Sequence, residues 1–298
     1  MSDELAQKKG AAVPIILTLC FAAVGGAAFD YLRSPLPWMI GAMVVTTVAA
    51  LSGVPIQRSN RLRNYMVGVL GTMLGTGFTP QTVTDALDWG PTLLAMLLYV
   101  STIGTVSYFY LTRIVKYDRV SSFFASAPGG LIEMVNLGSS YGGDERTMSL
   151  VHSMRLLLTV MIIPFWFRFF QGYDPSAVVV TSHSADFTLL DLAILFACTV
   201  VGYIGGKILR LPAYAMLGPL TVSGLAHVTG LSDARIPQEL INIAQVILGA
   251  SIGCQFAGLA LKKVFGNLIA GSVTTFIMLG TAAAFAVLMS HLTGIDYK

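Results

Sequence analysis

The sequence has few charged residues. Aspartate, glutamate, lysine and arginine make up 11% of its 298 residues, whereas soluble domains carry about a quarter. Apolar residues reach 55% and the mean hydropathy is +0.74, so a water-soluble fold is close to excluded. The net charge of +3 comes from short loops, and no basic tract is dense enough to indicate a nucleic-acid partner.

Cysteine, histidine and enzyme motifs are also scarce. The cysteines, Cys20, Cys198 and Cys254, lie far apart in apolar segments, which indicates packing residues rather than a disulfide framework or a zinc site. The four histidines are widely separated, and the sequence has no phosphate-binding loop, no zinc-protease motif and no nucleophile elbow. We therefore expect no metal, no cofactor and no enzymatic activity.

Apolar runs of spanning length recur along the whole chain. They predict an all-α polytopic membrane protein in contact with the lipid bilayer. Residues 1–11 mix acids and lysines without a cleavage pattern, so we expect a retained cytoplasmic segment. We place about ten hydrophobic helices near residues 12–30, 35–52, 64–82, 90–112, 120–138, 147–169, 187–209, 212–230, 238–257 and 265–291.

Two parts of the sequence repeat each other. Arg33–Gly41 aligns with Arg210–Gly218 without a gap, and Gly71–Gly75 aligns with Gly249–Gly253 after a shift of one residue. These matches predict a duplication, with a first membrane repeat over 12–185 and a second over 186–298. The second repeat has no counterpart of the Ala-Pro-Gly-Gly segment discussed next, and a partner protomer could complete it in a homo-oligomer.

The lysines and arginines bear on the topology. If the segment carrying Pro128 is re-entrant, the two repeats are inverted, and most basic residues fall in cytoplasmic loops. If the segment spans the membrane, the repeats are parallel and fewer basic residues face the cytoplasm. The inverted arrangement is favoured, with the N-terminus in the cytoplasm, and inverted repeats with broken helices are typical of secondary transporters.

A helix break is predicted at Pro128, Gly129 and Gly130. Proline has no amide hydrogen for the helix, and glycine adopts backbone angles closed to other residues. Inside a bilayer such a break is tolerated where protein or a water-filled cavity supplies hydrogen bonds. A helix restarting at Leu131 would present its amides to an anion, with Glu133 as a proton site, a cation site or an acid at the helix start. A simple kink or interfacial loop is the alternative.

Ionisable residues gather after the break. His152 and Arg155 are three residues apart, so they share one helix face. Arg155 either binds an anionic substrate, forms a structural ion pair with Glu133 or Asp144, or reaches the interface. His152 either shuttles protons or is a hydrogen-bonded packing residue. Asp144 and Arg146 are assigned to structural or ion-pair roles.

These residues resemble those of the duplicated AbrB family of bacterial inner-membrane proteins. The resemblance covers nearly the whole chain. Members are often labelled as ammonia monooxygenases or as regulators of the aidB gene, and a soluble DNA-binding regulator of the same name has an unrelated fold. The residues that carry the resemblance are Ala127-Pro128-Gly129-Gly130-Leu131-Ile132-Glu133-Met134, Asp144, Arg146, His152, Arg155 and Gly249-Ala250-Ser251-Ile252-Gly253.

Three functions follow from the sequence and the resemblance. The first is a secondary transporter or channel-like carrier of a small anionic solute, with Pro128, Gly129, Gly130, Glu133, His152 and Arg155 at the site. The second is a membrane sensor that alters gene expression without transport. The third is a membrane monooxygenase, which the spacing of the histidines disfavours.

Overall fold

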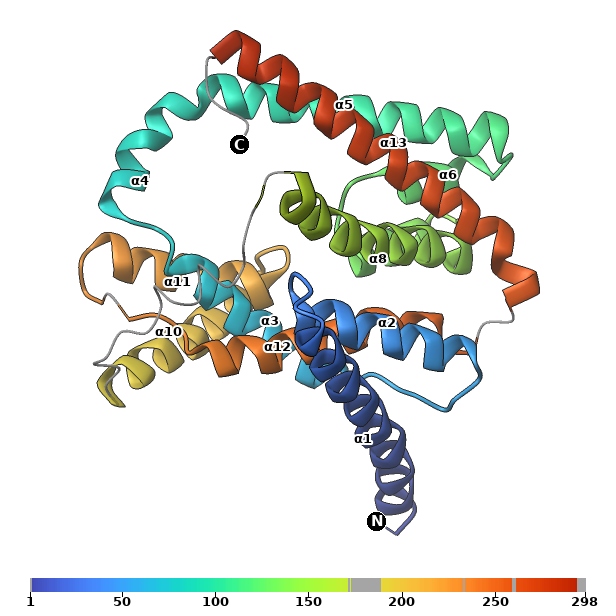
Figure 1. Cartoon of the computed structure of the whole chain (residues 1–298), viewed down its shortest axis with the longest axis horizontal. Coiled ribbons are helices and arrows are strands. Elements are labelled where there is room, and N and C mark those ends of the chain that lie inside the picture. The colour runs from blue at the N-terminus through green and yellow to red at the C-terminus, as the bar shows by residue number, and fades with distance from the viewer. Residues whose placement is uncertain (1, 171, 173–188, 233, 259–260, 294–298) are drawn as a thin grey trace. The chain divides into compact units, whose positions relative to one another are not determined.

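The computed structural model describes residues 2–170, 172, 189–232, 234–258 and 261–293, and in these ranges it consists of helices joined by short loops, without strands (Figure 1). A helix needs about twenty apolar residues to span the hydrocarbon core of a bilayer. Within the described residues, helices of this kind cover Val13–Tyr31, Gly90–Ile114, Glu145–Phe170, Leu190–Ile208, Gln238–Phe256 and Phe265–Met289. The protein is therefore an all-α polytopic membrane protein, as predicted.

Exposed apolar side chains cover much of these helices. On the segment Gly90–Ile114, for example, Leu93, Leu94 and Leu97 are all exposed. In water such a surface would be unfavourable, but lipid chains are as apolar as leucine, so these side chains suit contact with the bilayer.

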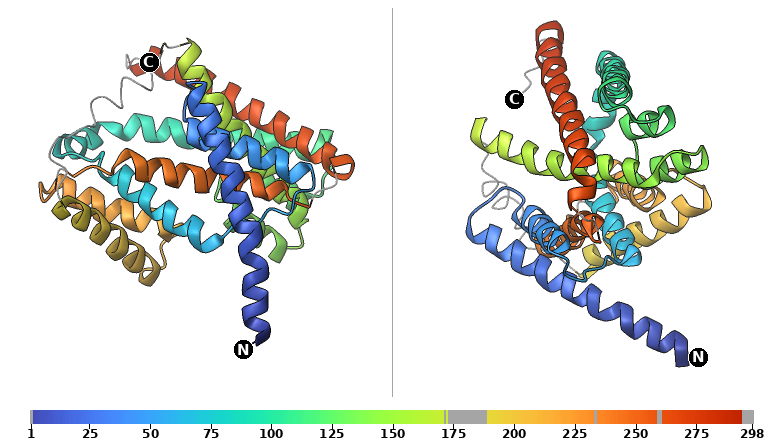
Figure 2. Two further views of the ribbon diagram at one scale, coloured as in Figure 1. Left: turned by 60° about the horizontal axis from the view of Figure 1, so that its bottom comes forward. Right: turned by 90° about the vertical axis from the view of Figure 1, so that its right-hand side faces the viewer.

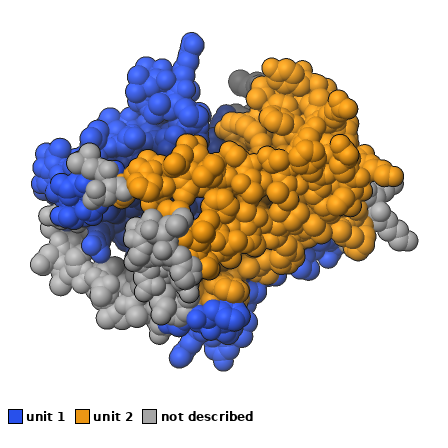
Figure 3. Space-filling model, turned by 90° about the horizontal axis from the view of Figure 1, so that it is seen from above, with its two compact units in different colours: residues 1–87, 168–258 blue, residues 88–167, 259–298 orange. Residues whose placement is uncertain are grey.

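The chain forms two compact units, coloured separately in Figure 3. Unit 1 comprises residues 1–87 and 168–258, and unit 2 comprises residues 88–167 and 259–298. Both sequence halves contribute to both units, because the chain enters unit 2 after residue 87 and again after residue 258.

Unit 1 is a bundle in which helices from the two sequence halves alternate. Helix α2 packs against α12, and α11 packs against α3, while α1 covers α2 and α10 covers α11 (Figures 1 and 2). The bounds are α1 Ser2–Tyr31, α2 Pro37–Leu51, α3 Asn60–Gly75, α4 Pro80–Asp85, η1 Ala86–Trp89, α10 Leu189–Ile208, α11 Tyr214–Val228, α12 Gln238–Gly253 and η3 Cys254–Phe256.

Glycines set the close contacts between these helices. A side chain at Gly71 of α3 would strike the backbone of Met216 in α11, and one at Gly249 of α12 would strike the backbone of Met39 in α2. Gly71 aligns with Gly249 and Met39 with Met216 in the two sequence repeats. The two contacts therefore join positions that the sequence alignment pairs. Only a residue without a side chain lets two helix backbones approach so closely.

The connections before α2 and α11 also correspond. Leu36 and Ala213, the residues that precede the two helices, both have left-handed backbone angles, with φ of 43° and 47°. Such angles are rare for residues with a side chain. The aligned glycines after the same helices, Gly53 and Gly230, also have positive φ, of 82° and 71°.

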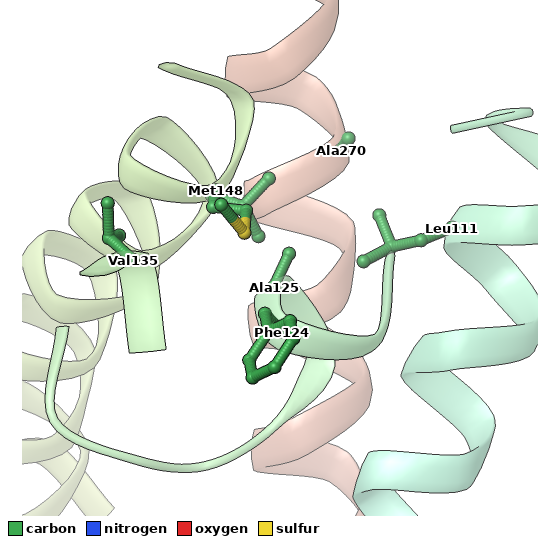
Figure 4. Close-up of a cluster of buried hydrophobic side chains, with 7 residues drawn as sticks. Leu111, Phe124, Ala125, Val135, Met148 and Ala270 are labelled. Atoms are coloured by element: carbon green, nitrogen blue, oxygen red, sulfur yellow. The ribbon is translucent and has the colours of Figure 1, made fainter. Parts of the chain in front are cut away.

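Unit 2 surrounds the predicted helix break. Helix α5 packs against α13 and α6, and α6 packs against α7. A buried apolar cluster joins α6, α7, α8 and α13 through Phe124, Val135, Met148 and Ala270, and the turn after α5 adds Leu111 (Figure 4). The bounds are α5 Gly90–Phe109, the π-turn η2 Tyr110–Ile114, α6 Arg119–Ser126, α7 Leu131–Ser140, α8 Glu145–Phe170 and α13 Leu261–Thr293.

Candidate functional site

The break lies where the sequence predicts it. Helix α6 ends at Ser126 and α7 begins at Leu131. The predicted reason for the glycines is wrong, because neither Gly129 nor Gly130 has a positive φ. A methyl group at either position would instead displace a neighbouring side chain. A Cβ at Gly129 would lie 2.9 Å from the Met134 side chain, and one at Gly130 would collide with the Glu133 carboxyl group.

Pro128 leaves a backbone acceptor free at the end of α6. In an uninterrupted helix the carbonyl of Phe124 would accept the amide hydrogen of residue 128, and proline has none. The imidazole of His152, on α8, supplies the missing donor: its Nε2 lies 2.9 Å from Phe124 O. The side chain of His152 is 1% exposed, so water does not compete for this bond.

Arg155 caps a second carbonyl of the break. Its Nη2 donates to Ala127 O at 3.3 Å and also to Nδ1 of His152. The shared face of His152 and Arg155 is thus confirmed. The ion pair with Glu133 or Asp144, one of the three alternatives for Arg155, is not formed among the described residues, where Arg155 has no acidic partner. Asp144 precedes the first residue of α8, about three helical turns before Arg155, and Glu133 is exposed on α7.

These contacts define the protonation of His152. A carbonyl oxygen only accepts and a guanidinium only donates. Nε2 therefore carries the hydrogen that faces Phe124 O, and Nδ1 is the bare acceptor that faces Arg155. His152 is a neutral imidazole with both nitrogens engaged, which matches the packing interpretation rather than the proton shuttle.

Asp144 and Asp118 cap the helices on either side of the break. The Asp144 carboxylate accepts the amide hydrogens of Arg146 and Thr147 at the start of α8, and the side chain of Arg146 is exposed. Asp118 caps α6 by accepting the amide of Ser121 at 2.8 Å. Partial burial acts to raise the pKa of Asp118, but its hydrogen bonds, chiefly with Ser121, outweigh burial, so the pKa is lowered.

A chain of polar side chains connects these caps to α13. The hydroxyl of Tyr117 donates to Asn267 Oδ1 at 2.7 Å, the Asn267 amide donates to Thr147, and Thr147 donates to Asp144. The amide of Asp144 in turn donates to the Ser121 hydroxyl at 2.7 Å. Burial, followed by neighbouring Tyr110 and Asp144, raises the pKa of Tyr117 to about 12, so its phenol stays a donor at neutral pH.

A small pocket opens beside the guanidinium of Arg155. It has room for about one water molecule. Its walls combine one cation, three hydroxyl groups and three apolar side chains, contributed by α5, α6, α8 and α13 of unit 2. The lining residues are Arg155, Ser107, Ser126, Thr274, Ile103, Ala125 and Met278.

Several of these groups were not predicted from the sequence. Phe124 and Ala127 act through backbone carbonyls, and Ser107 and Thr274 come from distant helices. The sequence does indicate Phe124, because the carbonyl four residues before a proline in a helix has no amide hydrogen to accept. No cluster of three or more histidine, cysteine or acidic side chains could hold a metal ion among the residues with described positions.

Comparison with known proteins gives a family and two relatives. A family model described as "Transition state regulatory protein AbrB" matches residues 38–298. "Uncharacterized protein YhjN" of Bacillus subtilis is 28% identical over 305 residues, which cover 93% of this chain and 78% of the relative. "Putative regulator AbrB" of Escherichia coli is 26% identical over 267 residues, covering 88% of this chain and 76% of the relative. No solved structure matches the chain.

Proposed function

Because the chain belongs to the AbrB family, we propose on this premise that it is a secondary transporter, or a channel-like carrier, of a small anionic solute in the bacterial inner membrane. The N-terminus lies in the cytoplasm, and the solute binds at the break between α6 and α7. This function goes beyond the names of the two relatives, one of which refers to regulation.

The observation that carries this proposal is the environment of Arg155. A charged arginine inside an apolar spanning helix is costly, and such residues usually mark substrate or ion sites. Arg155 lies in the middle of α8, lines the pocket of unit 2, and has no acidic partner in the described chain. Within the described chain its Nη1 and Nε have no acceptor, so an anion from solution is the group that would complete the site.

The broken segment supplies the second argument. Neither α6, with 8 residues, nor α7, with 10, is long enough to cross a membrane. Discontinuous helices of this kind line the substrate sites of carriers, where a few backbone groups become available to solutes and ions. Pro128, Gly129 and Gly130 keep the segment open, His152 fixes the guanidinium of Arg155, and exposed Glu133 is a candidate site for a coupling proton or cation.

A membrane sensor that regulates gene expression is the second candidate. The name of the Escherichia coli relative, "Putative regulator AbrB", favours it. A sensor and a carrier would both bind the solute at Arg155, but only a carrier moves it across a bilayer. Binding alone therefore does not separate them, whereas flux does.

The first experiment is a thermal-shift screen of the detergent-solubilised protein with acetate, methanesulfonate, phosphate and ammonium salts. A ligand that binds only the folded state raises the melting temperature. We expect an anion to do so for the wild type and for Arg146→Ala, but not for Arg155→Ala. Arg146→Ala is the matched control because it removes the same charge from an exposed position on the same helix.

The second experiment measures uptake of the stabilising anion into proteoliposomes. We expect uptake by the wild type and by Arg146→Ala, and none by Arg155→Ala in preparations that elute as the same single species. Binding without uptake would support the sensor and overturn the carrier. Stabilisation that persists in Arg155→Ala would place the anion elsewhere and overturn the site.

A further inference from the structure

Four helices of unit 2 meet at one end of the unit. They are α5 with the π-turn that ends it, and the starts of α6, α8 and α13. Hydrogen bonds join these ends, since Tyr117 bonds to Asn267 near the start of α13, and Asn267 bonds to Thr147 in the first turn of α8. The buried apolar cluster packs the same helices together. Three of the membrane-spanning segments, those that contain α5, α8 and α13, therefore have an end at this face of unit 2.

The broken segment enters and leaves unit 2 at this same end. Asp118 caps α6, where the segment begins. The amide of Asp144, where the segment ends, donates to the hydroxyl of Ser121 in the first turn of α6 at 2.7 Å. The two ends therefore lie side by side, with Pro128 between them in the chain. This is the re-entrant arrangement, in which most basic residues are expected on the cytoplasmic side of the membrane.

Exposed basic side chains gather at this end. The π-turn, the connection after it, the first residue of α6 and the first turn of α8 each contribute one. None of them forms an ion pair with an acidic side chain in the described chain. Asp118 and Asp144 instead accept amide hydrogens at the starts of α6 and α8. The four residues, which we call the basic end of unit 2, are Arg113, Lys116, Arg119 and Arg146.

Positive charge is concentrated at this end of the helices. The sequence adds Lys262 and Lys263 in the first turn of α13, while Glu145 is exposed beside the basic end. At the far ends of α5, α8 and α13, the described acidic, lysine and arginine residues are Asp88, just before α5, and Arg168, in the last turn of α8. Because lysine and arginine are enriched on the cytoplasmic side of membrane proteins, we expect the basic end to face the cytoplasm.

Apolar side chains beside these cations favour a lipid partner. Phe109 and Ile114 continue the exposed apolar surface of α5 to its end, and Ile114, next to Arg113, is 71% exposed. Phe123, one turn along α6 from Arg119, is 57% exposed. A surface that combines cations with exposed apolar groups suits the boundary between headgroups and acyl chains. A soluble acidic partner would match the charges but not the adjoining lipid-facing surface.

We propose that the basic end of unit 2 binds the phosphate headgroups of anionic phospholipids in the cytoplasmic leaflet. Arginine presents two parallel N–H groups to a phosphate, and lysine adds a mobile charge. Arg119 begins α6 and Arg146 lies at the start of α8, so bound headgroups hold both ends of the broken segment at the membrane surface. This surface does not include Arg155, and the inference is independent of the proposed function.

The test uses the full-length protein in a non-ionic detergent and measures lipid binding by native mass spectrometry. The probes are dioleoylphosphatidylglycerol, which is anionic, and dioleoylphosphatidylcholine, which is zwitterionic. The test variant is Arg113→Gln/Arg119→Gln. Arg33→Gln/Arg235→Gln is the matched control, because it also removes two exposed arginines, but from unit 1.

The wild type should bind phosphatidylglycerol more tightly than phosphatidylcholine. Each arginine removed from the basic end should weaken phosphatidylglycerol binding about fivefold, or about 20-fold in the double variant, with no change for phosphatidylcholine. The control should keep the preference of the wild type. Added salt should reduce the preference, because ions in solution screen exposed charges.

Contrary results overturn the inference in different ways. A wild type without the preference, or a test variant that keeps it, would show that the basic end is not a lipid site. An equal loss in the control would assign the effect to net charge rather than to these residues. Displacement of phosphatidylglycerol by equimolar glycerol phosphate would indicate a site for free phosphate, and displacement by polyglutamate would indicate a site for an acidic protein. None of these results bears on anion uptake through Arg155.

Discussion

Replacing His152 with leucine tests the capping of the break most directly. The substitution keeps a buried apolar volume but removes both hydrogen-bonding nitrogens. Phe124 O then loses its donor in a buried site where Pro128 provides none, and Arg155 loses the acceptor for one Nη2 hydrogen. A buried carbonyl left unpaired costs about 1–3 kcal/mol, and a hydrogen bond to a charged group contributes about 1.5–3 kcal/mol. The two effects arise at one residue and do not add fully, so we expect the free energy of unfolding to fall by about 2–4 kcal/mol in total.

The assay is thermal unfolding in a fixed detergent, with His152→Gln as the matched control. The glutamine amide can donate to Phe124 O and its oxygen can accept from Arg155, so it should retain most of the stability that leucine loses. At a few degrees per kcal/mol for a chain of this size, the two variants should be clearly separated. If His152→Leu melts with the wild type, or if His152→Gln is as unstable as His152→Leu, the capping argument is refuted.

Two further predictions concern helix packing and pH. Gly71→Ala should destabilise the protein by about 1–3 kcal/mol, because the new methyl group meets the backbone of Met216, whereas Gly104→Ala, with no atom within 4 Å of the new methyl, should be neutral or stabilising in thermal unfolding. Tyr117→Phe should cost about 1 kcal/mol through its lost bond to Asn267. Since folding raises the pKa of Tyr117 to about 12, its contribution should be full below pH 10, the range of an unfolded tyrosine, and be lost as the pH rises toward 12. A stability difference between wild type and Tyr117→Phe that does not change over this interval would contradict that assignment.

The helix break and the shared face of His152 and Arg155 could be predicted from the sequence because both depend only on neighbouring residues. Pro128 ends a helix wherever it lies, and a spacing of three residues puts His152 and Arg155 on one helix face. The partner of Arg155 could not be predicted by choosing among nearby acids. The Asp144 carboxylate caps the start of α8 instead. Arg155 donates to His152 and to a backbone carbonyl, and because every residue has a backbone carbonyl, the residue types do not indicate which one is used.

The role of the glycines illustrates the same limit. A glycine beside a proline indicates a helix break, but it does not show whether the glycine is present because of its backbone angles or because of its small size. Here the angles are ordinary, and the neighbouring side chains Met134 and Glu133 occupy the space that a Cβ would need. Both side chains belong to the first turn of α7, three and five residues further along the chain, and the sequence does not show which rotamers they adopt.

By itself the sequence determined the class of the protein and the position of its break, since hydropathy, helix length and the missing amide of Pro128 depend only on neighbouring residues. Tertiary structure alone decided which groups complete the break. Ser107 of α5, Ser126 of α6, Arg155 of α8 and Thr274 of α13 are far apart in the chain, and packing brings them to one pocket. A hydrogen bond or a pocket depends on distances in space, and the order of residues along a helix fixes those distances only within that helix.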